Sequence, residues 1–211
     1  MSENEQAKSE SSSGFETLCG LTLAILAAVL AITDLGAGKY GEDEIIGHNL
    51  KTDAYSWYQS KSIKQSLVEG QRDLLKVLLD SGTVTAERQP VMMEMAARLD
   101  EDVRRYKKEK QEILLGSAGV GEENWVLEQD GKKGQITGAK EWEARTAVLN
   151  AAGDTFDLAV FFLQICLVVG AISLLLKGDR MKYGFYGGML LLGLIGAGLS
   201  VLAYHQAGAF G

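Results

Sequence analysis

The chain has 211 residues, with 28 acidic and 21 basic side chains and a formal net charge of −7. This balance argues against a nucleic-acid-binding surface, and the one short basic run, 104–108, is bordered by acidic residues. Three stretches, 17–33, 158–176 and 183–204, carry no charge at all. The composition therefore predicts an all-α membrane protein with three apolar segments around a polar middle region.

Residues 1–15 are predicted as a disordered acidic tail, and residues 16–35 as transmembrane helix 1. The uncharged part of this segment is shorter than the roughly 20 apolar residues that a bilayer core requires, so a cleaved signal peptide is an alternative. A signal peptide begins with a basic region, whereas this N-terminus has Lys8 as its only basic residue before the segment. We therefore expect an uncleaved span.

The segment Gly36-Ala-Gly38-Lys-Tyr-Gly41 follows the first span and matches the pattern GxGxxG. That pattern binds a phosphate when it lies between a strand and a helix, and this one follows an apolar helix. We interpret the segment as a flexible hinge.

The residue types that hold metals or perform catalysis are scarce and scattered. Cys19 and Cys166 lie inside apolar segments, and His48 and His205 have no ligand partners at metal-binding spacing. No Ser, Cys or Thr lies in a recognisable nucleophile motif. We expect no metal, no cofactor and no enzymatic activity.

Residues 36–155 are predicted as an extramembrane helical domain with helices at about 42–80, 88–115 and 139–156. The second helix has an apolar seam with coiled-coil spacing. Its members are Met92, Ala96, Leu99, Val103, Tyr106, Lys110 and Ile113. The same period in the first helix predicts a matching seam. Its apolar members are Ile46, Leu50, Trp57, Leu67, Leu74 and Leu78, and its polar members are Asp53, Ser60, Lys64 and Gln71. The short connection between these helices predicts an antiparallel hairpin inserted between the first and second spans.

One stretch of the first helix, 55–65, concentrates three aromatic rings and two lysines. The candidate residues for a partner or packing face are Tyr55, Trp57, Tyr58, Lys61 and Lys64. Three interpretations remain open. The stretch is a packing layer with lysine stems over aromatic rings of adjacent helices, an anchor at the membrane interface, or a ligand or partner site.

Residues 116–137 lose the helical period and are predicted as an irregular insert. Within it, Asp130-Gly131 is typical of the turn of a small β-hairpin between 124–127 and 135–137. From Ala139 a third helix is predicted to run directly into the second span.

Residues 156–177 and 183–205 are predicted as transmembrane helices 2 and 3, joined by a basic loop at 178–182 and followed by a tail at 206–211. Basic residues in short loops favour the cytoplasmic side. We therefore expect the N-terminus in the cytoplasm, and the middle region and C-terminus on the other side of a bacterial inner membrane, in the periplasm.

Small residues recur at helical spacing in the first and third spans, where they allow helices to approach closely, within one chain or between chains. In the first span they are Gly20, Ala24, Ala27, Ala28 and Ala31. In the third they are Gly184, Gly188, Gly193, Gly196, Ala197 and Ser200.

Two motifs resemble those of an uncharacterised bacterial membrane family, domain of unknown function 4337. The first comprises Tyr58, Gln59, Lys61, Ile63, Lys64 and Gln65, and in the second Phe156-Asp-Leu-Ala159 precedes Leu163-Gln-Ile165. Tyr55 stands where the family has Trp. The resemblance implies three spans with a helical portion outside the inner membrane, and it implies no activity.

The functional expectation is a non-enzymatic structural or assembly protein, surrounded by membrane lipid. Its extramembrane domain would mediate self-association into a homo-oligomer, or join a larger envelope complex as a small subunit. The alternative is an oligomeric transport or channel component.

Overall fold

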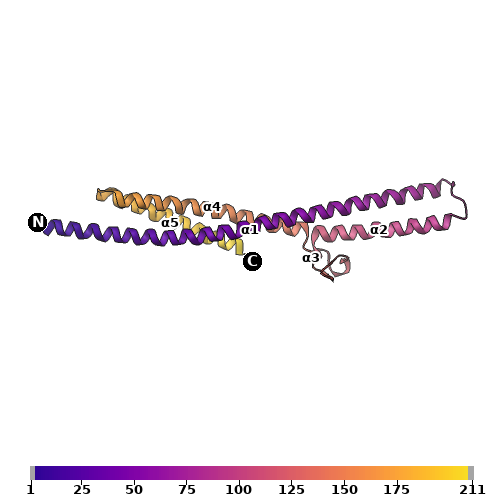
Figure 1. Cartoon of the computed structure of the whole chain (residues 1–211), viewed down its shortest axis with the longest axis horizontal. Coiled ribbons are helices and arrows are strands. Elements are labelled where there is room, and N and C mark those ends of the chain that lie inside the picture. Colours follow the sequence, from indigo (N-terminus) through magenta and orange to yellow (C-terminus); the bar gives the residue numbers. More distant parts are fainter. Residues whose placement is uncertain (1–2, 209–211) are drawn as a thin grey trace. The chain divides into compact units, whose positions relative to one another are not determined.

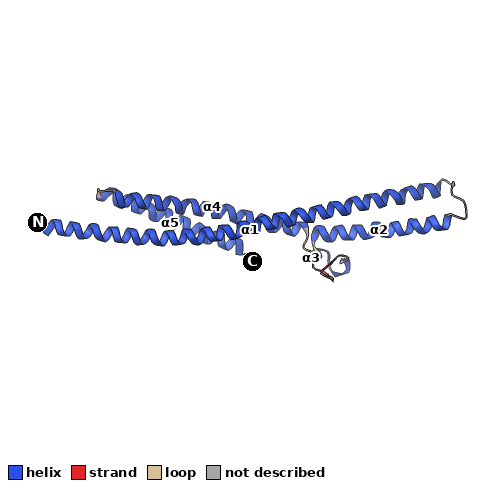
Figure 2. Ribbon diagram, viewed as in Figure 1, coloured by secondary structure: helices blue, strands red, loops and turns tan. Residues whose placement is uncertain are grey.

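The computed structural model describes residues 3–208, and their side chains from Gly14 onward (Figures 1 and 2). Its helices are α1 (Glu3–Asp80), α2 (Gln89–Leu115), α3 (Ser117–Val120), the 3-10 helix η1 (Glu122–Asn124), α4 (Ala139–Leu175) and α5 (Asp179–Gly208). Strands β1 (Glu128–Gln129) and β2 (Lys132–Lys133) pair antiparallel. Of the two predicted tails, residues 1–2 and 209–211 lie outside the described part of the chain.

Helix α1 is longer than the sequence predicts, because it runs without a break from Glu3 to Asp80. The tail predicted as disordered is therefore helical from Glu3 onward, and this stretch contains no proline to prevent it. The hinge predicted at 36–41 is also helical. Glycine costs roughly 1 kcal/mol in a helix, but at Gly36 it has a purpose, because a Cβ there would overlap the Tyr204 ring.

Three helices are long and apolar enough to cross a membrane by length and composition: α1 from Gly14, α4 and α5. This agrees with the three predicted spans. Helix α4 is continuous from Ala139 to Leu175, as the sequence predicts. Helix α5 begins at Asp179, so the basic segment predicted as a loop at 178–182 is mostly the first turn of a helix.

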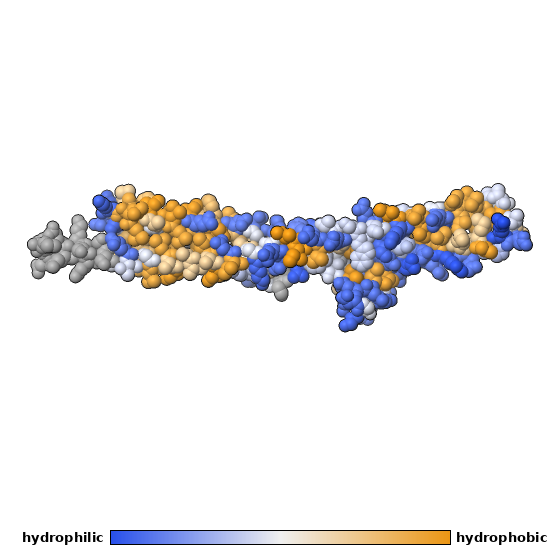
Figure 3. All heavy atoms as spheres, viewed as in Figure 1, coloured by the Kyte–Doolittle hydropathy of each residue, from blue (hydrophilic) through white to orange (hydrophobic). Residues whose placement is uncertain are grey.

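The chain divides into two compact units: unit 1 comprises residues 1–45 and 147–211, and unit 2 comprises residues 46–146. In unit 1 a buried cluster of Leu163, Cys166 and Met189 packs against residues of α1 such as Leu26. The side chains on the other faces are exposed, as at Leu194 with 74% of its surface. Figure 3 shows these apolar residues over α4, α5 and the first half of α1. Such a surface suits lipid and not water.

In unit 2, the second half of α1 lies against α2, and successive ion pairs show that the two run antiparallel. Lys61 pairs with Glu109, and Arg72 farther along α1 pairs with Asp100 earlier in α2. The predicted seam of α2 is confirmed, because all seven of its residues are buried or partly buried.

The predicted seam of α1 is wrong as a contact with α2, since its six apolar members are all exposed. The face that meets α2 lies one position farther along the helix, at residues such as Ala54, Tyr58, Lys61, Gln65 and Arg72. Charge decides between the two faces. The acidic groups of α2 lie at this contact, and partly buried carboxylates need cationic partners.

The predicted hairpin turn in the insert is confirmed at Asp130 and Gly131, which both have positive φ, 51° and 75°. Two positive φ values in a two-residue loop define a type I′ turn, which favours Asp-Gly. The ladder is shorter than predicted, since it contains two residue pairs and the expected strands 124–127 and 135–137 lie outside it.

Candidate functional site

The contact between α1 and α2 contains a crossed pair of lysines and tyrosines. Lys61 of α1 lies 5.7 Å from the ring centre of Tyr106, and Lys110 of α2 lies 5.0 Å from that of Tyr58. Each lysine is also bound to a polar partner. Lys61 pairs with Glu109 at 2.5 Å, and the Lys110 ammonium donates to Gln65 Oε1 at 3.1 Å. These contacts combine cation–π attraction with ion pairing in a partly buried layer.

The structure does not bring the five candidate residues of the 55–65 stretch to one face. Tyr58 and Lys61 point toward α2. Trp57 and Lys64 are exposed on another side of α1, and Trp57 retains 38% of its surface. A packing layer therefore describes Tyr58 and Lys61, and it does not describe Trp57 and Lys64.

Tyr55, the fifth candidate, turns toward α4. Its hydroxyl donates a hydrogen bond to Glu143 Oε2 at 3.0 Å. This bond, reinforced by slight burial and by the negative charge of Glu143, raises the pKa of Tyr55 above its ordinary value. The phenol is thus a structural donor that links the first and last helices of unit 2.

A second charged group lies nearer the loop that joins α1 to α2. Asp100 accepts from Arg72 at 3.2 Å and lies 3.4 Å from the Lys76 ammonium. Desolvation alone would raise the pKa of Asp100, but the bonds and charges of Lys76 and Arg72 outweigh it and hold the pKa below its ordinary value. The site is an ionic clasp between the helices and contains no group suited to catalysis.

The exposed face of α1 carries a long apolar row, which we call the α1 stripe and define by its six apolar residues. They are Ile46, Leu50, Trp57, Leu67, Leu74 and Leu78. Leu67 and Leu74 keep 63% and 61% of their surface, although leucine on an isolated helix face is stabilised by burial. In Figure 3 apolar residues also come to the surface over α1 and α2. A contiguous exposed patch of this kind marks an interaction surface.

Glu112 is a structural residue that the sequence analysis missed. Its carboxylate is fully buried, and it accepts hydrogen bonds from the Ser117 hydroxyl at 2.8 Å and from the Val126 and Leu127 amides at 2.9 Å. Ser117 Oγ in turn accepts from the Ile136 amide at 3.0 Å. This carboxylate organises the insert, and the only signal in the sequence was a glutamate immediately before an apolar residue at the end of a helix.

In α5, the small residues predicted as a span-packing face mostly lie at helix contacts. Gly193, Gly196 and Ser200 are buried, and Ala197 is partly buried. A Cβ at Gly193 would lie 2.7 Å from Leu26, and one at Gly196 would lie 2.7 Å from Leu163. Ser200 also shares a hydrogen bond with Thr33 of α1 at 2.8 Å. Farther toward the start of α5, Gly188 would make ordinary contact with Val169, whereas Gly184 faces open space.

In α1, the predicted small-residue face points away from the other helices of unit 1. Its members, Gly20, Ala24, Ala27, Ala28 and Ala31, are all exposed. Larger side chains make the contact instead, including Cys19, Leu23 and Leu26. Three helices of unequal side chains leave gaps that Leu fills better than Ala, so within this chain the correction follows from packing density.

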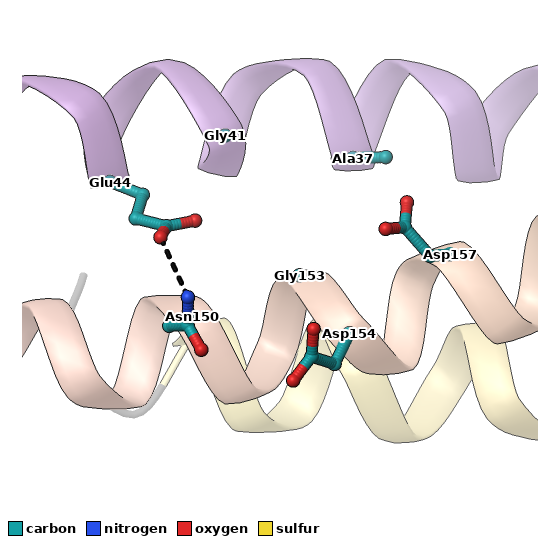
Figure 4. Close-up of a pocket in the computed structure, with 7 residues that line it drawn as sticks. All are labelled: Ala37, Gly41, Glu44, Asn150, Gly153, Asp154 and Asp157. Atoms are coloured by element: carbon teal, nitrogen blue, oxygen red, sulfur yellow. Dashed lines mark hydrogen bonds between the residues drawn. The ribbon is translucent and has the colours of Figure 1, made fainter.

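Unit 1 also contains a cleft of about 310 Å³ between α1 and α4 (Figure 4). Its lining residues are Ala37, Gly41, Glu44, Asn150, Gly153, Asp154 and Asp157. Figure 4 shows Glu44 reaching from α1 to Asn150, whose amide donates to the carboxylate at 3.0 Å. Among the residues that the structure describes, no group of three or more His, Cys, Asp or Glu side chains is arranged to hold a metal ion.

Taken together, these features define a helical protein with three potential membrane spans and a second helical unit joined by ionic contacts. The chain belongs to the family described as a domain of unknown function, DUF4337, whose model matches residues 15–206. No curated protein and no solved structure matches the chain.

Proposed function

We propose that the protein is a non-enzymatic structural or assembly protein of a bacterial inner membrane. Its three apolar helices cross the bilayer, and unit 2 lies outside it as an antiparallel helical hairpin inserted between the first and second spans. The observation that carries this proposal is the α1 stripe. The cationic side chains of α1 at the α2 contact turn inward, while a row of large apolar residues faces outward and awaits a partner.

The proposed orientation places the N-terminus in the cytoplasm, and unit 2 and the C-terminus in the periplasm. It draws on Lys177, Arg180 and Lys182, which cluster at the short connection between α4 and α5. A membrane-impermeant thiol reagent tests it in a background without native cysteines. Lys132→Cys, in an exposed strand, should react in spheroplasts, and Gly178→Cys should react only after the membrane is opened.

The alternative function, an oligomeric transport or channel component, draws on a different observation. The exposed row of small residues in the first half of α1 would let the spans of neighbouring copies approach closely. A pore requires a closed ring of several chains, whereas an assembly subunit works singly or in pairs. The mass of the purified complex separates the two.

The assembly function is tested by adding charge to the α1 stripe. Leu67→Glu combined with Leu74→Glu should abolish the cross-linked species that form in native membranes, because burying two carboxylates at an apolar contact is costly. The matched control adds the same charges to exposed positions beside the stripe, with Gln59→Glu and Ser66→Glu. Equal assembly of both double variants would refute the proposal.

A further inference from the structure

The α1 stripe belongs to a longer pattern that is symmetric from end to end. Between Ile46 and Leu78, ten positions alternate in spacing by four and three residues, as in a coiled coil. The six apolar ones form the α1 stripe, and the four polar ones are Asp53, Ser60, Lys64 and Gln71. All ten are exposed. Read from either end, the order of apolar and polar positions is the same, with Ser62 at its centre.

We propose that a second copy of this chain covers the α1 stripe, with the two α1 helices antiparallel about Ser62. This inference rests on the proposed assembly function and names its partner. In an antiparallel coiled coil each residue meets one at the same distance from the opposite end. The apolar contacts that result are Ile46 with Leu78, Leu50 with Leu74, and Trp57 with Leu67.

The polar positions select the antiparallel orientation. When the helices are antiparallel, Asp53 meets Gln71 and Ser60 meets Lys64, so that no two like charges face each other. A parallel pair would place Asp53 against Asp53 and Lys64 against Lys64, and such like-charge contacts are costly. Charge complementarity therefore separates two arrangements that are equivalent in their apolar contacts.

The polar positions also select the register. Sliding one antiparallel helix by seven residues in one direction places Asp53 opposite Leu78, and in the other direction it places Ile46 opposite Gln71. Either shift buries a polar group against an apolar one without a hydrogen-bond partner. The symmetric register is the one in which every apolar position keeps an apolar partner.

The residues beside the core positions agree with this geometry. On the side away from α2, Ile63 keeps 64% of its surface, and in the symmetric pair it lies beside its own counterpart. On the side toward α2, Lys61 and Gln65 are already engaged by Glu109 and Lys110. Helix α1 thus uses one face within the chain and leaves the adjacent face for the second copy.

The orientation is tested by disulfide cross-linking in native membranes, with Cys19 and Cys166 replaced by Ala. Two differently tagged variants, Ile46→Cys and Leu78→Cys, are co-expressed and oxidised. The expected product is the mixed dimer, with neither variant cross-linking to itself. Self-cross-linking of each variant without the mixed product would overturn the proposal in favour of a parallel pair, and the absence of any cross-link would overturn it as well.

A second variant keeps the test independent of cross-linking chemistry. Ser60→Glu would face Lys64 of the second copy twice in each dimer, so we expect the Kd of the detergent-solubilised dimer to fall by roughly 2-fold to 30-fold. In a parallel pair the same change would place Glu against Glu and raise the Kd. The matched control is Gln59→Glu, which adds the same charge at an exposed neighbouring position off the core and should leave the Kd unchanged.

These outcomes separate the inference from the function on which it rests. If Leu67→Glu with Leu74→Glu removes an assembly whose mass is not that of a dimer of this chain, the second copy is refuted and the assembly function stands. If the purified full chain is a dimer that this double variant does not dissociate, both are refuted.

Discussion

Removing the Glu112 carboxylate should disorder the insert while leaving the pairing of α1 with α2 in place. In Glu112→Ala, the Ser117 hydroxyl and the amides of Val126 and Leu127 all lose their acceptor. A buried donor without a partner costs roughly 1–3 kcal/mol. Three such donors predict a loss of at least roughly 3 kcal/mol, which is about a hundredfold in the opening equilibrium of this segment.

Glu112→Gln provides an intermediate case, because the amide oxygen still accepts from the two backbone amides while the negative charge is lost. Hydrogen bonds to charged groups stabilise more than neutral ones, by about 1 kcal/mol, so this variant should open roughly tenfold more often than wild type. Glu101→Ala, at an exposed position of the same helix, is the control and should change nothing measurable.

Amide hydrogen exchange of the full chain in nanodiscs is the appropriate measurement, since it reports the Val126 and Leu127 amides individually. In Glu112→Ala these amides, and that of Ile136, should exchange about a hundredfold faster than in wild type, while amides in the middle of α2 keep their rates. Unchanged exchange at Val126 and Leu127 would refute the argument that this carboxylate organises the insert.

Three further changes probe other contacts. Gly36→Ala places a methyl group against the Tyr204 ring and should lower the thermal stability of unit 1 by roughly 1–3 kcal/mol, whereas Gly38→Ala, which meets nothing within 4 Å, should be neutral or stabilising; equal melting of both variants would contradict the close approach. Because the pKa of Asp100 is lowered in the folded state, its contribution is fully present above the unfolded value of 3.8 and is lost as the pH falls through the folded value; acid titration of stability should therefore be shallower in Asp100→Asn, and an identical slope would count against the clasp. Tyr58→Ala should destabilise unit 2 by roughly 3 kcal/mol in denaturant titrations, whereas Trp57→Ala should change the stability of the single chain by less than about 0.5 kcal/mol, and the reverse order would show that Trp57 faces α2.

Local chemistry made several features predictable from the sequence. Pro90 lies in the first turn of α2 and Gly116 caps its end with a φ of 82°, because proline fixes the helical φ and glycine adopts the left-handed one. The Asp130-Gly131 turn follows from the same kind of preference. Where a few neighbouring residues decide the conformation, the pattern and the structure agree.

The features that the sequence did not predict depend on residues far away along the chain. The period of α1 indicates an apolar face, and the choice of the other face for α2 depends on Glu109 and Asp100, which are paired with Lys61 and Arg72. Gly36 was interpreted as a hinge because the ring of Tyr204 that packs over it lies 168 positions later. The role of Glu112 likewise depends on amides in a segment without periodic pattern.

The exposed Asp130-Gly131 turn offers a practical handle on the living cell. Both flanking strands are exposed, and a Cβ on Gly131 would meet nothing within 4 Å. Tips of this kind accept foreign sequence more readily than helices do. An epitope or a compartment-sensitive reporter inserted between Asp130 and Gly131 would therefore reveal the location of unit 2 in growing cells, without fractionation and without altering the native cysteines.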